Sequence, residues 1–378
     1  MAGHSHFSPA NVEEHFDFTS EGKKRIIYAF IAGVVALVVG IYLLSKGEAG
    51  GHEVAAAGHE AAKAGHEAAA EHLSGGAVSH QAGAEEHYDW TNRIWANVWL
   101  NAVFFTGIAV VGMFFVSLQY LTKSGWSAVM KRVPEAFPKF LYISLPILIL
   151  TFFFKGDVIF HWMHHGVTEV GNANYDKIIA GKSGYLNKNF FLIRLVGFGA
   201  LWILLWNMLR KKSLEEDLNG GTEYFTQLVK IGTAFIVIFG ASSSIFAWDW
   251  VMSIDTHWFS TMFGWYMFAS WHVTTYAVIV LAVLYLKDKG LMAYVNENHL
   301  HDLGKFMFAF SIFWTYVWFE QFLLIYYANL PEETIYFLER WEGYDKLYKS
   351  SEILMVILNF LLPFLVLMTR DAKRTRIF

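Results

Sequence analysis

The sequence contains no cysteine, which excludes disulfides, thiolate-bound metals, Cys-ligated iron–sulfur clusters and covalently attached c-type haem. Charged residues are also scarce: they make up 16% of the 378 residues, against about 25% in a typical soluble domain. Hydrophobic residues reach 55%, and 18% of the chain is aromatic. This balance predicts an integral membrane protein. No phosphate-binding loop, Gly-rich nucleotide fingerprint or nucleophile triad is visible, and we expect no nucleic acid partner.

Long apolar runs recur along the chain. Because about 20 helical residues cross the hydrocarbon core of a bilayer, they predict an all-α polytopic membrane protein with about eight transmembrane helices. The predicted spans are 26–45, 94–121, 140–160, 190–209, 225–250, 262–286, 305–328 and 350–369.

The distribution of basic residues predicts the orientation. If residues 1–25 form a cytoplasmic segment, the cytoplasmic side carries 18 of the 29 Lys and Arg residues. The positive-inside rule then places both ends of this chain in the cytoplasm.

The segment 46–93 is rich in His and Ala and lies in an outer loop on this topology. His52, His59 and His66 recur every seven residues, so they would line one side of a helix. Weak metal capture or pH sensing is one interpretation, and a solvated spacer is the favoured one.

The polar stretch from Ser242 to Trp271 lies between two apolar spans. Ser242, Asp249, Asp255 and His257 stand there among mainly hydrophobic residues. Since ionisable side chains at membrane depth are costly, we interpret them as a proton pathway. For the serine, a bond back to its own helix is the alternative.

The span at 140–160 ends in a second polar group. Asp157, His161 and His164 or His165 share one helical face. A carboxylate beside an imidazole suits proton transfer, and a set of interfacial residues is the alternative.

Glu320 lies among Phe and Trp residues in the span at 305–328, and we predict it as a further proton site, with Arg194 as a candidate partner. Snorkelling of Arg194 to the membrane interface is the alternative. The candidate quinone-binding residues are Tyr266, His272, Tyr316 and Trp318. For His272, packing in the core is the alternative.

Three functional classes fit these patterns: a respiratory subunit that handles quinol or protons, a secondary transporter, and a structural membrane anchor. Transporters usually show two similar halves with broken helices near the midplane, and no such pair is visible.

Three segments carry a resemblance to a known family: DWVMSIDTHWFSTMFGWYMFA, WFEQFLLIYYANLPEETIYF and RVPEAFPKF. They resemble the ActF family, the second NrfD/PsrC-like membrane subunit of alternative complex III, a bacterial quinol:cytochrome c oxidoreductase. The resemblance covers most of the chain from about Tyr88. It implies a flanking helix at 26–45, a first four-helix bundle at 94–250 and a second bundle at 251–378, of which three helices are present.

The resemblance also implies partners and location. The expected partners are an ActC-like sibling membrane subunit, an iron–sulfur subunit, multihaem and monohaem cytochrome c subunits, lipids and a terminal oxidase, in the bacterial inner membrane. Haem and iron–sulfur clusters would belong to those subunits only. Menaquinone or its quinol is the candidate ligand here, but the resemblance places the better-supported quinol site in the ActC-like sibling, and a proton-conducting or structural role is the alternative for this chain. The family pattern has about ten helices, so either this chain is incomplete at its C-terminus or the pattern does not hold there.

Overall fold

The computed structural model describes residues 90–342 and 347–374, together with scattered positions between 24 and 39. The chain divides into two units, Met1–Val78 and Ser79–Phe378, and the description below concerns the second. Apart from those scattered positions, the predicted segment 1–25 and the span at 26–45 lie outside the described residues, as does the loop at 46–93 up to Asp89.

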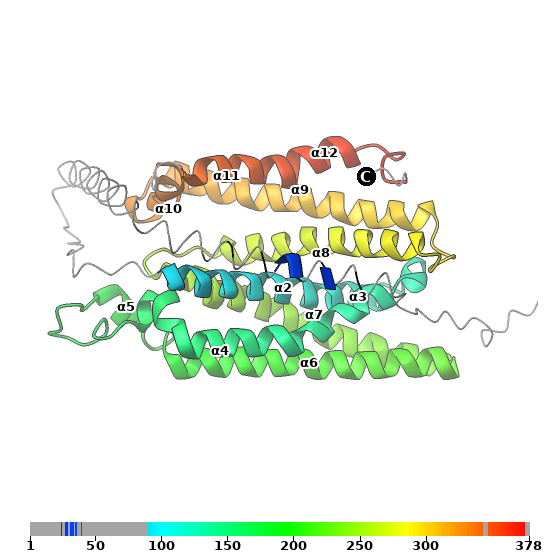
Figure 1. Cartoon of the computed structure of the whole chain (residues 1–378), viewed down its shortest axis with the longest axis horizontal. Helices are drawn as coiled ribbons and strands as arrows, with labels where there is room; N and C mark the ends of the chain where they lie inside the picture. The colour runs from blue at the N-terminus through cyan, green and yellow to red at the C-terminus, as the bar shows by residue number, and fades with distance from the viewer. Residues whose placement is uncertain are drawn as a thin grey trace, which may run out of the picture. The chain divides into compact units, whose positions relative to one another are not determined.

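Helices are the regular elements of the described part of this unit, and no strand occurs in that part (Figure 1). The elements are α2 (Trp90–Leu121), η2 (Trp126–Val129), α3 (Arg132–Ala136), η3 (Phe137–Phe140), α4 (Leu141–Ile159), η4 (His161–Met163), α5 (Lys177–Lys182), α6 (Lys188–Asn219), α7 (Thr222–Trp250), η5 (Met252–Ile254), α8 (Met262–Asp288), α9 (Glu297–Ala328), α10 (Pro331–Trp341), α11 (Leu347–Val356), the π-helical turn η7 (Ile357–Leu361) and α12 (Leu362–Leu367).

Seven helical stretches in the described part are long and apolar enough to cross a membrane. They coincide with the last seven predicted spans, and the chain is an all-α polytopic membrane protein. The helices extend beyond the apolar runs: α6 continues to Asn219, and α9 begins already at Glu297. Hydropathy marks only the part of a helix that lipid surrounds, whereas the charged turns beyond it stay helical in water.

Local signals explain where several helices begin and end. Asn296 caps the start of α9 in a capping box with His299. Asn329 ends that helix in the left-handed conformation, and Pro331 then opens α10. Gly220 and Gly221, both with positive φ, form the turn from α6 to α7.

The helix α2 lies at the centre of the bundle and packs against α4, α7 and α8. The helices α6 and α7 pack together on one side, and α8 and α9 on the other. The interior is rich in aromatic rings, and Phe152 stacks on Phe191 with ring centroids 4.5 Å apart. The final span, Lys349–Leu367, lies along α9 and is the least buried.

Glycine residues allow α7 and α8 to pack closely against the central helix α2. Gly107 of α2 faces the buried indole of Trp271 on α8, and Gly232 of α7 faces the backbone of Ser117. Such close contacts between small residues stabilise helices in a bilayer, where lipid weakens the hydrophobic driving force between them.

Candidate functional site

The polar residues predicted as functional lie mainly at the end of the bundle that holds α5 and α10, which we call the α10 end (Figure 1). Two groups of side chains occur there. One is a set of charged and imidazole groups around the end of α7, and the other is a cavity between α8, α9, α10 and α11.

Arg194 of α6 and Asp249 of α7 form a buried ion pair. The guanidinium Nε donates to Asp249 Oδ2 at 2.6 Å, and its Nη2 donates to Oδ1 at 3.1 Å. The two residues are 7% and 1% exposed. The guanidinium also covers the ring of Tyr185 at 3.9 Å and donates to that residue's carbonyl. Arg194 is therefore the partner of Asp249, and the prediction that it pairs with Glu320 is wrong.

Ser242 lies on α7, seven residues before Asp249, and is fully buried. Its hydroxyl accepts a hydrogen bond of 3.1 Å from Trp202 Nε1 of α6. This bond holds α6 against α7 close to the ion pair, and it gives the serine a partner across the helix interface.

A cluster of His and Asp side chains forms where α4, α5 and the α7–α8 connection meet. His257 Nε2 lies 2.6 Å from Asp176 Oδ2, and the ring of His161 lies 6.0 Å from that of His257. His164 stacks on His161 with 5.0 Å between ring centroids. The structure thus brings together His161 and His257, which were predicted from separate motifs.

Asp176 was not predicted from the sequence. It is the N-cap of α5, and its Oδ1 accepts hydrogen bonds from the N–H groups of Ile178 and Ile179. Partial burial acts to raise the pKa of Asp176, but these N–H groups and His257 outweigh it, so the pKa lies below its ordinary value. The side chain is therefore a carboxylate at neutral pH and can accept a hydrogen bond from the His257 imidazole. The sequence signal was an Asp directly before a short helix.

Asp157 and Asp255 are exposed at the same end of the bundle. Asp157 lies in the last turn of α4, and Asp255 ends η5, where its carboxylate accepts from Trp258 N. Nearby, Lys182 donates to the carbonyl of Thr256 at 2.5 Å. Within residues 90–342 and 347–374, no group of three or more His, Asp or Glu side chains is arranged to hold a metal ion.

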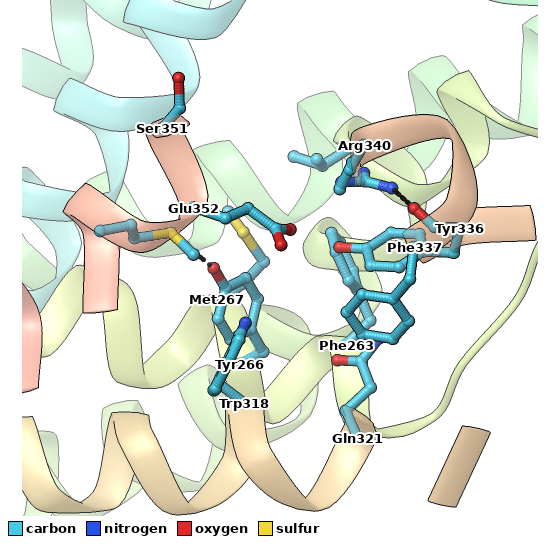
Figure 2. Close-up of a pocket in the computed structure, with 12 residues that line it drawn as sticks. Phe263, Tyr266, Met267, Trp318, Gln321, Tyr336, Phe337, Arg340, Ser351 and Glu352 are labelled. Atoms are coloured by element: carbon cyan, nitrogen blue, oxygen red, sulfur yellow. Dashed lines mark hydrogen bonds between the residues drawn. The ribbon is translucent and has the colours of Figure 1, made fainter. Parts of the chain in front are cut away.

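A cavity of about 300 Å³ lies between α8, α9, α10 and α11, and two of the predicted quinone-binding residues, Tyr266 and Trp318, line it. Figure 2 shows side chains of α8, α9, α10 and α11 around the cavity. The lining residues are Val251, Phe263, Tyr266, Met267, Trp318, Gln321, Tyr336, Phe337, Arg340, Ser351, Glu352 and Met355.

The walls of the cavity are aromatic. Tyr336 stacks on Trp258 with ring centroids 4.1 Å apart, and the guanidinium of Arg340 covers its ring at 3.4 Å. Burial raises the pKa of Tyr336, so its phenol stays protonated. Among the described residues, the Tyr266 hydroxyl donates to the sulfur of Met355, at 3.3 Å. A thioether is a weak acceptor.

Gln321 gives the cavity a polar group that lacks a partner. Its side chain is 5% exposed, and its Nε2 has no hydrogen-bond partner among the described residues. An unsatisfied buried donor costs about 1–3 kcal/mol. A ligand that presents an acceptor would remove this cost. Gln321 lies three residues after Trp318, and this helical spacing was the signal in the sequence.

The remaining predicted residues lie elsewhere. His272 is fully buried between Phe268 and Phe310, and its Nδ1 donates to the Phe268 carbonyl at 2.7 Å. Tyr316 is 58% exposed and contacts half-buried Glu320 one turn along α9. Neither His272, Tyr316 nor Glu320 lines the cavity.

Neither a protein-family model nor a curated protein matches this chain.

Proposed function

We propose that this chain is a membrane subunit of a respiratory quinol:electron acceptor oxidoreductase, and that its cavity at the α10 end binds the ring of a menaquinone-type quinone. The observation that carries this proposal is the unpaired Gln321 amide in a cavity walled by aromatic rings. A quinone offers a flat ring for stacking and carbonyl oxygens that accept hydrogen bonds. The volume lies at the lower end of the range for small-molecule sites, about 300–1,000 Å³.

The roles of the residues follow from their chemistry. Trp318 would contact a face of the ring, and Tyr336 would present its edge, because Trp258 and Arg340 cover its two faces. Gln321 would donate to one carbonyl oxygen. Tyr266 would exchange its weak bond to the Met355 sulfur for a stronger bond to the other oxygen. These residues bind and orient the ring, and the redox centres that receive electrons belong to the partner subunits.

We also propose that the chain assembles with the subunits that the sequence motifs imply. The partners would be an ActC-like sibling subunit, an iron–sulfur subunit, the cytochrome c subunits, lipids and a terminal oxidase in the bacterial inner membrane. The N-terminus would be cytoplasmic, and the α10 end would then face outward.

The test is quinone binding to the purified chain. We expect menadione to quench the tryptophan fluorescence of the chain in detergent saturably, and Gln321→Leu to weaken binding about tenfold, which corresponds to about 1.4 kcal/mol. Gln119→Leu is the matched control, because Gln119 is equally buried and also has an unpaired amide atom but lies at the other end of the bundle. It should change the affinity less than twofold.

Two results would contradict the quinone site. One is an unchanged affinity of the Gln321→Leu variant, and the other is the absence of saturable quenching with the wild-type chain. The second result would favour the role of a structural anchor.

Proton transfer at the same end is a second candidate function, favoured by the contact of 2.6 Å between His257 and Asp176. In vesicles that contain the complete assembly, we expect Asp176→Asn to lower the number of protons released per electron while quinol oxidation is largely kept. Asn preserves the helix cap but removes the carboxylate charge beside the imidazole of His257. Asp302→Asn, in the first turns of α9, is the control. An unchanged proton stoichiometry would make Asp176 a structural residue.

A further inference from the structure

A second cavity of about 300 Å³ lies at the opposite end of the bundle, where α2 ends and η2 begins. Figure 1 shows this end, beside α3, on the far side from α10. We call it the α3-end cavity. It is lined by Phe115, Val116, Gln119, Tyr120, Lys123, Ser124, Gly125, Ser127, Ala128, Lys131, Glu216 and Phe225.

The polar wall of the α3-end cavity is fixed by a charge network. Lys131 Nζ lies 2.9 Å from Glu216 and 3.2 Å from Asp217, and it donates to the Tyr120 hydroxyl at 3.2 Å. That hydroxyl in turn donates to Glu216 at 2.8 Å. Burial acts to lower the pKa of Lys131, but Glu216, Tyr120 and Asp217 outweigh it and raise the pKa. Lys131 is therefore an immobile, permanent cation at the cavity.

Lys123 supplies a second positive charge. It follows α2 in the left-handed conformation, with a φ of 55°, and its side chain is exposed. Within the described ranges it forms no ion pair, in contrast to Lys131. An anion at the cavity would thus meet one cation that has carboxylate partners and one that has none.

Gln119 provides an independent sign of a missing ligand. Its side chain is 6% exposed and lines the cavity, yet its Oε1 has no hydrogen-bond partner among the residues that the structure describes. The hydroxyl-bearing Ser124 and Ser127 lie on the same wall. Phe115 and Phe225 form the apolar part of the lining.

The surroundings are positive. Residues 122–139 and 210–230, which border the cavity, contain eight Lys and Arg residues and five Asp and Glu residues, a net charge of +3. Clusters of basic residues at the end of transmembrane helices attract anionic lipid head groups. Apolar rings beside them suit an acyl chain.

We propose that the α3-end cavity binds an anionic phospholipid with a hydroxyl-bearing head group, of the phosphatidylglycerol class. The phosphate lies between Lys123 and Lys131, a head-group hydroxyl bonds to Gln119, and an acyl chain lies against Phe115 and Phe225. The bound lipid satisfies the buried amide and balances the positive charge of this end. The proposal does not depend on the quinone site.

Native mass spectrometry of the whole chain, titrated with single lipids, tests this proposal. We expect dioleoylphosphatidylglycerol to bind at least about tenfold more tightly than dioleoylphosphatidylcholine, since the first lipid carries a net negative charge and head-group hydroxyls, whereas choline cancels the phosphate charge of the second. Lys123→Gln should weaken phosphatidylglycerol binding about fivefold. Lys139→Gln is the matched control, because Lys139 is exposed nearby but does not line the cavity. It should change binding less than twofold.

Gln119→Leu separates a built site from diffuse attraction, because it removes no charge. It should also weaken phosphatidylglycerol binding about fivefold, with an unchanged thermal midpoint for each variant. Equal binding of the two lipids, or equal losses for Lys123→Gln and Lys139→Gln, would overturn the proposal. Displacement of the lipid by 10 mM inorganic phosphate, roughly a hundredfold above the lipid concentration, would assign the site to free phosphate and overturn it as well.

Discussion

Replacement of Asp249 by Asn should destabilise the folded chain by about 3–5 kcal/mol, because it leaves the Arg194 guanidinium charged and without a counter-ion in the bundle. Both partners are buried, and two hydrogen bonds join them. Water cannot reach the freed charge to compensate it. The measurement is the thermal midpoint of the purified protein in detergent, followed through its helical circular dichroism.

A double variant separates the cost of an orphaned charge from the value of the pair. Arg194→Met with Asp249→Leu removes both charges and should recover most of the lost stability. Asp302→Asn is the control, since its partner Lys305 is 57% exposed. Loss of that exposed pair should cost less than about 1 kcal/mol. If the double variant were less stable than Asp249→Asn, the pair itself would stabilise the fold.

Gly107→Ala should be the second strongly destabilising change, at about 1–3 kcal/mol. A Cβ atom built on Gly107 would overlap the indole of Trp271, which is itself 4% exposed. The two helices would have to separate or the indole would have to leave its rotamer. Because α2 contacts most of the bundle, separation from α8 would disturb several interfaces.

The control for this change is Gly197→Ala. Gly197 lies inside α6, and nothing within 4 Å would contact the added Cβ. Alanine is the better helix former by about 1 kcal/mol, so this variant should be as stable as the wild type or slightly more stable. Similar thermal midpoints for the two alanine variants would show that the α2–α8 contact adjusts without cost.

The transmembrane helices were predictable because the bilayer imposes one simple requirement on each of them. A run such as 94–121 must be apolar along its whole length, and no distant residue is needed to recognise it. The ends were less predictable. The polar turns of α6 beyond residue 209 carry Lys211, Lys212 and Glu215, which hydropathy assigns to a loop but which continue the helix.

Contacts between helices were the part that the sequence did not reveal. The sequence led us to predict Glu320 as the partner of Arg194, and only the packing of α6 against α7 identifies Asp249 as the partner. Similarly, the sequence analysis counted Lys131, Arg132 and Arg210 only among the basic residues that predict the membrane orientation. In the structure they pair with Glu216, Asp217 and Glu135, the last of which is buried.

In the candidate site, too, the sequence indicated the chemistry of the residues but not the contacts between their helices. Tyr266 and Trp318 were selected for their ring chemistry, and they do line one cavity. His272 was selected for the same reason but points into the aromatic core, because α8 turns that face toward Phe114 of α2. Arg340 and Glu352 reach the cavity from α10 and α11, and no periodicity in the sequence links those helices to α8.

The central place of α2 bears on the order in which the chain is synthesised. α2 ends at Leu121, whereas its neighbour α8 begins at Met262, 141 residues later. At about 5–20 residues per second of translation, α2 waits roughly 7–28 s in the bilayer before that neighbour exists. Residues 94–121 contain no Asp, Glu, Lys, Arg or His, and the Thr106 hydroxyl bonds to the Ala102 carbonyl of its own helix. Of the described spans, α2 is the most buried in the folded bundle. Its apolar sequence nevertheless allows it to remain stable in lipid before the helices that will surround it have been synthesised.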